Sequence, residues 1–161
     1  KTITQMLFVE GNHICPSCEK TGNCKLQAMG YYLGMLDDHF PQFYSSRELD
    51  ASHPRILLDR SRCIVCDLCV RASREIDRKN VFVIAGRGTQ AHLMVNSPSG
   101  KLVDSTIDVT DVATTICPVG AILIKEQGYQ TPIGQRIYDQ HTIRETALQE
   151  NMSTRTKNDG D

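Results

Sequence analysis

The sequence of 161 residues has no tryptophan, no apolar run of membrane-spanning length and a net charge of only −1 with histidine neutral. The missing apolar run argues against a transmembrane helix, because a helix that crosses a bilayer needs about 20 mostly apolar residues. The balanced charge gives no support for a nucleic-acid or membrane partner. With 40% hydrophobic residues the core is expected to be modest, so bound cofactors are expected to help organise it.

The two ends of the sequence give separate expectations. The first residues carry no secretory signal pattern. Lys1 to Val9 has the pattern of the end of a helix, with apolar residues at helical spacing, so we expect a longer natural chain in which other residues precede Lys1. Residues 152–161 are charged or small, which predicts a disordered tail or an arm that docks on a partner.

The seven cysteines are grouped too closely for a typical disulfide framework, which would use an even number with wider spacing. Clustered thiols in a chain without an export signal more often bind metal. We therefore expect reduced, metal-binding cysteines in a cytoplasmic protein, with disulfides as the weaker alternative. The cysteines are Cys15, Cys18, Cys24, Cys63, Cys66, Cys69 and Cys117.

One group places three thiols, Cys63, Cys66 and Cys69, at two-residue spacing. Three thiols on one short turn can hold three corners of an iron–sulfur cubane, and a distant cysteine followed by proline is the usual fourth ligand. Cys117 with Pro118 matches that role. No second run of this spacing lies near Cys117, so this part of the chain is expected to hold one cluster.

The other group is the run from His13 to Cys24, in which Cys15, Cys18 and Cys24 follow the histidine. Pro16, Gly22 and Asn23 in the same run let the backbone curl around a centre. Thiolates and an imidazole suit zinc and iron–sulfur chemistry about equally, so this run alone leaves both open.

The apolar pattern predicts an α+β fold with two lobes, a helical one over residues 1–54 and a ferredoxin-like one over 55–127, followed by an extension over 128–161 that is partly disordered or docks on a partner. Residues 101–103 are expected to pair with the strand at 92–95, and Asp108 is expected to cap the helix at 109–116. The other expected helices cover 25–36, 70–77 and 139–150, and the other expected strands cover 56–59, 81–84 and 121–124.

Two charged or glycine-rich features are ambiguous from the sequence. Arg60 and Arg62 stand just before Cys63, where they could balance the negative charge of a cluster or be ordinary surface charge. Gly86-Arg87-Gly88 resembles part of a dinucleotide fingerprint, but no helix with a third glycine follows, so nucleotide binding is not expected there.

Taken together, these motifs resemble the iron–sulfur diaphorase subunit of soluble NAD-reducing [NiFe] hydrogenases, which is similar to the N-terminal part of the large iron–sulfur subunit of complex I. The resemblance covers nearly the whole chain. It rests on Cys-Pro-Ser-Cys at 15–18, on Cys-Pro-Val-Gly at 117–120 and on the flanking residues 10–20, 24–27 and 62–66.

The resemblance implies two [4Fe–4S] clusters. One would be held by His13, Cys15, Cys18 and Cys24, and the other by Cys63, Cys66, Cys69 and Cys117. The complex I relatives carry the ligand histidine at the position of Gly11, so this chain departs from their spacing. The family also has an N-terminal [2Fe–2S] domain, which is absent from this sequence.

The implied function is electron transfer without a catalytic base of its own, within a hydrogen:NAD oxidoreductase. The expected partners are a flavin-containing, NAD-binding diaphorase subunit, which would hold FMN and NAD, and the small and large hydrogenase subunits. One alternative is the equivalent subunit of an NAD-dependent formate dehydrogenase or a complex I-like enzyme. An alternative of another class is a structural zinc protein with two sites that acts as an interaction module.

Overall fold

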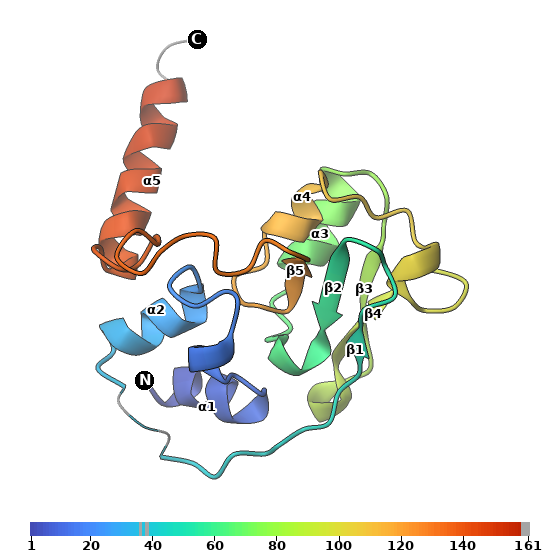
Figure 1. Ribbon diagram of the computed structural model, residues 1–161, viewed down its shortest axis with the longest axis horizontal. Helices are drawn as coiled ribbons and strands as arrows, with labels where there is room; N and C mark the ends of the chain where they lie inside the picture. The colour runs from blue at the N-terminus through green and yellow to red at the C-terminus, as the bar shows by residue number, and fades with distance from the viewer. Residues whose placement is uncertain (36, 38, 159–161) are drawn as a thin grey trace.

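A computed structural model describes residues 1–35, 37 and 39–158 of the chain, with side chains up to residue 151. Helices α1 and α2 lie beside a region that contains all five strands together with α3 and α4, while α5 projects away from both (Figure 1). The fold is thus a mixture of helices and sheet, as the sequence predicts. The helices are α1 (Thr2–Glu10), α2 (Lys25–Tyr32), α3 (Leu68–Glu75), α4 (Val112–Thr115) and α5 (Ile143–Asn158). The strands are β1 (Leu49–Asp50), β2 (Ile56–Asp59), β3 (Phe82–Ala85), β4 (His92–Val95) and β5 (Ile122–Ile124).

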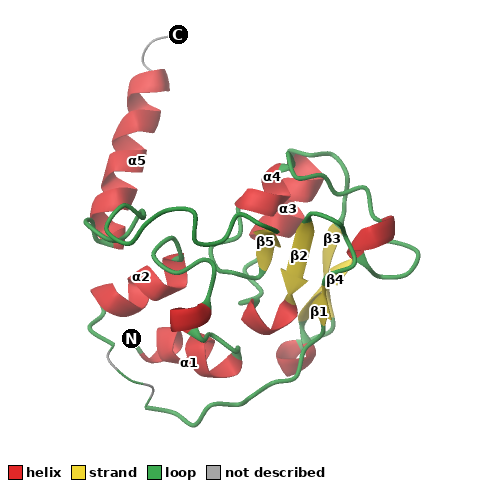
Figure 2. Cartoon of the chain, in the orientation of Figure 1, coloured by secondary structure: helices red, strands yellow, loops and turns green. Residues whose placement is uncertain are grey.

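The main sheet has the order β1-β2-β5, with antiparallel neighbours (Figure 2). Ile56 and Leu58 of β2 are fully buried because alternate residues of a strand face the same side, and here that side is the core. β2 ends at Asp59, whose carboxylate accepts a hydrogen bond from Ser61 N in the 3₁₀ turn η2 (Arg60–Arg62). The strand therefore leads directly into the first cysteine of the Cys63–Cys69 turn.

β3 and β4 form a second, two-stranded sheet, in which Phe82 faces Val95 and Ala85 faces His92. The expectation that residues 101–103 would pair with β4 is wrong, because β4 pairs with β3 and residues 102–104 form the 3₁₀ turn η4 (Leu102–Asp104). Leu102 is fully buried, and its backbone N–H donates to the buried carboxylate of Asp50 at 2.8 Å. The apolar residue that suggested a strand instead anchors a turn.

Helices α3 and α4 pack against one another, and α4 is shorter than the pattern of residues 109–116 predicts. It starts at Val112 because the carboxylate of Asp77, just beyond α3, accepts hydrogen bonds from Val112 N and Ala113 N. Asp108 does not cap it and instead binds Thr110 in the preceding turn. A carboxylate from another part of the chain therefore satisfies the free N–H groups of this helix end.

The remaining differences concern helix ends. α2 ends at Tyr32, and Gly34 just beyond it has φ +61°. The sequence pattern predicted that this helix would end at Leu36, which lies outside the described residues. α5 begins at Ile143 and runs to Asn158, past residue 150 where the pattern ended it. Residues 159–161 of the expected tail lie outside the described residues. In the described part of the chain, no helix combines the length and the apolar character needed to cross a bilayer.

Candidate metal centres

The first candidate centre, called the turn centre below, is formed by Cys63, Cys66, Cys69 and Cys117. All four cysteines line one cavity, together with apolar side chains from the same turn and from β3, β4 and β5. Cys117 arrives from the end of α4 and is buried, as is Cys69 near the start of α3. The structure therefore brings the three local thiols and the distant one around a common space, as the sequence predicts.

The backbone of this turn is shaped so that N–H groups reach the thiols. Val65 and Asp67 have positive φ values of 53° and 66°, an uncommon conformation for residues with side chains. Val65 N lies 3.4 Å from Cys63 Sγ, and N–H groups of Leu68 and Val70 reach Cys66 and Cys69. N–H donors of this kind stabilise thiolate sulfur and influence the potential of a bound cluster.

The acidity of these thiols fits metal binding better than nucleophilic chemistry. Burial raises the pKa of Cys63 and of Cys69, and the neighbouring thiols, Cys117 first among them, raise both further. A catalytic cysteine needs the opposite shift, because the thiolate is the nucleophile. A metal centre supplies the positive charge that deprotonates such thiols, so the donor set fits a cluster.

The second candidate centre, called the loop centre below, is the run from His13 to Cys24. Cys15 starts the 3₁₀ turn η1 (Cys15–Ser17), and Cys24 lies just before α2, where N–H groups of Leu26 and Gln27 reach its thiol. Burial raises the pKa of Cys24 to about 11, with a smaller contribution from Cys18 and Cys15. These three thiols are therefore close enough to interact electrostatically.

His13 has a shielded ring nitrogen with no protein partner. Its Nε2 atom is buried and has no hydrogen-bond partner among the described residues. Burial, and then the charge of Arg62, lower the pKa of His13, which favours the neutral imidazole that ligates metals. Its ring packs edge-on against Phe8 at 5.8 Å, and a Cβ at Gly11 would lie 2.6 Å from Nε2. These contacts do not include a thiol, so ligation by His13 stays a prediction.

The two centres touch. Lys25 N, next to Cys24, donates to the carbonyl oxygen of Pro118, next to Cys117, at 2.8 Å. A Cβ added to Gly120 would lie 3.0 Å from Cys18 Sγ, so only glycine allows this approach without displacement. The loop that closes the turn centre therefore packs directly on the loop centre.

The two arginines before Cys63 have different partners. Arg60 turns away from the centres, and its Nε donates to the Leu93 carbonyl oxygen at 3.0 Å. Arg62 reaches the loop centre, where its Nη1 lies 3.7 Å from Cys18 Sγ and 2.7 Å from Glu19. The sequence left open whether these arginines balance the charge of a metal centre or lie on the surface. Arg62 places its charge beside a cysteine, but that cysteine is Cys18 of the loop centre and not Cys63 of the turn centre.

Residues 129–138, which we call the strap, hold the loop centre from outside, a contact that the sequence does not indicate. Tyr129 Oη donates to the Ser17 carbonyl oxygen at 2.6 Å, and Tyr138 N donates to the Gly22 carbonyl oxygen at 3.0 Å. Ile137 N donates to the Asn23 side chain at 2.9 Å. Gly22-Asn23 in the sequence signalled a turn but gave no indication of what would bind it.

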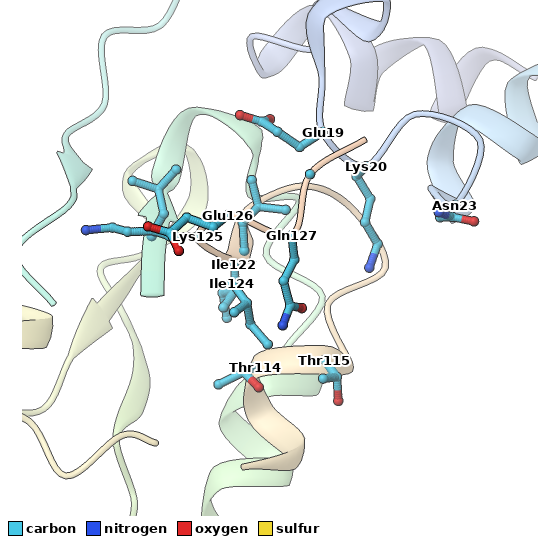
Figure 3. Close-up of a pocket in the computed structure, with 13 residues that line it drawn as sticks. Glu19, Lys20, Asn23, Thr114, Thr115, Ile122, Ile124, Lys125, Glu126 and Gln127 are labelled. Atoms are coloured by element: carbon cyan, nitrogen blue, oxygen red, sulfur yellow. The ribbon is translucent and has the colours of Figure 1, made fainter. Parts of the chain in front are cut away.

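A cleft of about 410 Å³ lies between the cysteine loop, α4 and the residues of and after β5 (Figure 3). Glu19 and Lys20 face it from the cysteine loop, and Thr114 and Thr115 face it from α4. The described residues that line it include no cysteine. Among the described residues, no group of three or more His, Cys, Asp or Glu side chains converges closely enough to hold a single metal ion.

Comparison with known proteins gives relatives for both cysteine-bearing regions. Residues 1–39 match the NADH-ubiquinone oxidoreductase-G iron-sulfur binding region, and residues 56–124 match the 4Fe-4S single cluster domain. The gamma subunit of the NAD-reducing hydrogenase HoxS from Cupriavidus necator is 39% identical over 150 residues, which cover 92% of this chain and 63% of that protein. The chain is a relative of the iron–sulfur subunits of NAD-reducing hydrogenases.

A solved structure and a respiratory protein extend this relationship. A chain in the crystal structure of an NAD⁺-reducing [NiFe]-hydrogenase in the H₂-reduced state has 52% sequence identity and a TM-score of 0.83, over 86% of this chain and 59% of that one. The NADH-ubiquinone oxidoreductase 75 kDa subunit of Acanthamoeba castellanii is 32% identical over 127 residues, 73% of this chain and 17% of that protein. The resemblance predicted from the sequence is confirmed, and the chain spans about six tenths of the length of its hydrogenase relatives.

Proposed function

We propose that this chain is the electron-transfer subunit of an NAD-reducing hydrogenase, an oxidoreductase complex. It passes electrons through two [4Fe–4S] clusters between a flavin-containing NAD(H) subunit and the [NiFe] hydrogenase subunits. The observation that carries the proposal is the direct packing of the two cysteine-bearing segments on one another, through the Lys25–Pro118 hydrogen bond and the Cys18–Gly120 approach. Two redox centres held this close form a path for electrons.

The clusters, when bound, supply one-electron redox chemistry. The chain supplies the ligands, which we assign as His13, Cys15, Cys18 and Cys24 for the loop centre and Cys63, Cys66, Cys69 and Cys117 for the turn centre. Its backbone N–H groups at Val65, Leu26 and Gln27 are aimed at the thiols, and apolar side chains of the core line the turn centre on its buried side, whereas Cys66 is exposed. Ligand type, hydrogen bonds and burial are the properties by which a protein tunes such centres.

The chain divides by role into three parts in this proposal. Residues 1–54 hold the loop centre, residues 55–127 form the ferredoxin-like lobe with the turn centre, and residues 128–161 clasp the loop centre and face a partner. Location in the cytoplasm follows from the need to keep seven thiols reduced and metallated.

The relatives among respiratory enzymes favour one alternative, a subunit of a complex I-like enzyme, and a formate dehydrogenase is a related possibility. The same electron path would then serve a different terminal partner. Purification of the complex and metal analysis separate these: nickel supports the hydrogenase, molybdenum would indicate formate dehydrogenase, and neither metal would indicate a complex I-like enzyme.

A zinc-binding interaction protein is the alternative of another class. The lack of three converging donors in the described residues counts against a single-ion site, whereas a cubane spreads its ligands. Anaerobic purification followed by iron, sulfide and zinc assays tests the proposal. We expect about eight irons per chain with matching sulfide. About two zinc ions without sulfide would refute it.

A further inference from the structure

Arg62 lies at the junction of the two centres and binds groups from both sides. It comes from η2, one residue before Cys63 of the turn centre, yet its Nη1 lies 3.7 Å from Cys18 Sγ of the loop centre. The side chain is 20% exposed, so its charge is only partly screened by water. It is a positive charge fixed beside a thiol of the proposed loop cluster.

Two carboxylates hold the guanidinium in this orientation. Asp59 Oδ2 lies 2.9 Å from Nε, and Glu19 Oε2 lies 2.7 Å from Nη1. A planar guanidinium can bind several acceptors at once in a fixed geometry, which a lysine ammonium cannot reproduce. Removal of the cation would therefore also leave two negative charges near Cys18 without their partner.

Gly120 makes the approach of these groups possible from the other side. A Cβ at this position would lie 3.0 Å from Cys18 Sγ and 3.4 Å from Arg62 Nη1. The Cys117–Gly120 loop thus packs against both Cys18 and the Arg62 guanidinium. The geometry is imposed by packing and does not depend on a flexible surface side chain.

We propose that Arg62 is a positioning residue that raises the reduction potential of the loop centre relative to the turn centre. This rests on the proposed function, because it requires a cluster on Cys15, Cys18 and Cys24. Reduction adds negative charge to a thiolate-bound cluster, and a cation that donates to a ligand sulfur stabilises the reduced form more than the oxidised form. Arg62 therefore shifts an electron shared between the two centres toward the loop centre.

The test is Arg62→Gln in the full complex, purified anaerobically, with both clusters titrated by EPR at controlled potential. The loop-centre signal is identified as the one lost in Cys24→Ala. We expect the ratio of reduced to oxidised loop centre at a fixed potential to fall at least tenfold, which corresponds to about 59 mV for one electron. The matched control is Arg74→Gln, which removes a cation from an exposed pair with Glu75 and should change neither potential.

A second variant protects the test if Arg62→Gln fails to retain iron. Glu19→Gln removes the carboxylate that shares Arg62 Nη1 with Cys18, so the loop-centre potential should rise. An unchanged loop-centre potential in Arg62→Gln with full iron content, or in Glu19→Gln, would overturn this inference alone. A wild-type complex without iron and sulfide in this chain would overturn the proposed function and this inference with it.

Discussion

The two centres are built in opposite ways. The loop centre lies within one short run, residues 13–24, and is held from outside by Arg62, Gly120 and the strap. The turn centre brings three thiols from one turn together with the distant thiol of Cys117, so residues 70–116 fold between its proposed ligands. The loop centre is therefore held in position by residues from other parts of the chain, whereas Cys69 and Cys117 of the turn centre are part of the hydrophobic core. We therefore expect damage to the loop centre to stay local and damage to the turn centre to spread.

The largest effect is expected from Cys117→Ala. The side chain is 8% exposed within the core, and its ligand bond closes the loop that contains α3, β3, β4 and α4. We expect loss of about four irons and a fall of more than about 4 kcal/mol in the free energy of unfolding, because metal binding and folding are coupled. Iron assay and denaturant unfolding measure both. Thr115→Ala, exposed at the end of α4, is the control, and full iron content in Cys117→Ala would contradict the assignment.

Cys24→Ala is expected to remove the other half of the iron with a smaller loss of stability, about 1–3 kcal/mol. The loop centre can open without unfolding the main sheet, because local regions open at lower free energy than the core. Hydrogen exchange should show that amides of β2 and β5 keep their protection. If those amides lose protection as they do in Cys117→Ala, the contrast between the two centres does not hold.

His13→Cys tests the predicted histidine ligand of the loop centre. A thiolate in place of a neutral imidazole adds negative charge, so the loop-centre potential should fall on the order of 100 mV while the cluster remains. Redox-titrated EPR gives the value, and His92→Cys on the exposed side of β4 is the control for an added thiol. A loop-centre potential that stays at the wild-type value would show that His13 is not a ligand.

Gly22→Ala tests the strap. Gly22 has φ +79°, and a Cβ there would lie 2.2 Å from Arg136 Nε, so the variant should push the strap away and cost about 1–2 kcal/mol. Iron loss to a chelator should become faster for the loop centre and not for the turn centre. Gly100→Ala has a similar φ of +72° with nothing within 4 Å, so it carries the backbone strain without displacing the strap. Equal rates of iron loss in both variants would exclude the strap as a support.

The smallest effect is expected from Asp139→Asn. Arg136 binds Asp139 through its guanidinium and holds the pKa of that carboxyl below its ordinary value. Because this carboxyl pKa is depressed, the Arg136–Asp139 pair stabilises the folded protein fully above about pH 4. This stabilisation is lost as the pH falls further. This pair should therefore add no pH dependence to the rate of iron loss between pH 5 and 8. The amide oxygen of the variant can still accept the hydrogen bonds from Gly134 N and Arg136 N, so the variant should change the rate less than about twofold. A pH-dependent rate in that range that disappears in Asp139→Asn would contradict this interpretation.

Several elements could be predicted because their signal is local. β2, β4 and β5 lie where apolar residues alternate or run together, and α1 and α3 follow from helical spacing. The grouping of the thiols could also be predicted from the sequence, because cysteines separated by two residues lie on the same turn of the chain. The errors came from distant partners. Asp77 sets the start of α4 at Val112, and β4 pairs with β3 instead of with residues 101–103.

The site shows the same limit. Arg62 is one residue from Cys63 in the sequence, and nothing in the local pattern indicates that it contacts Cys18, which lies 44 positions earlier. The strap was expected to be a partner-docking or partly disordered extension, and no motif in it points to Ser17, Gly22 or Asn23. Both contacts depend on how the two regions pack, which the spacing of residues in the chain does not encode.

The sequence by itself determined the chemistry of this protein. The thiols, their spacing and the cysteine–proline pair specify which atoms can hold metal, because ligands on one turn are brought together by the local backbone. Only the tertiary structure decided that the two centres touch, that Arg62 bridges them and that residues 129–138 clasp one of them. The physical reason is that these contacts join segments far apart in the chain, and burial of the common core brings them together.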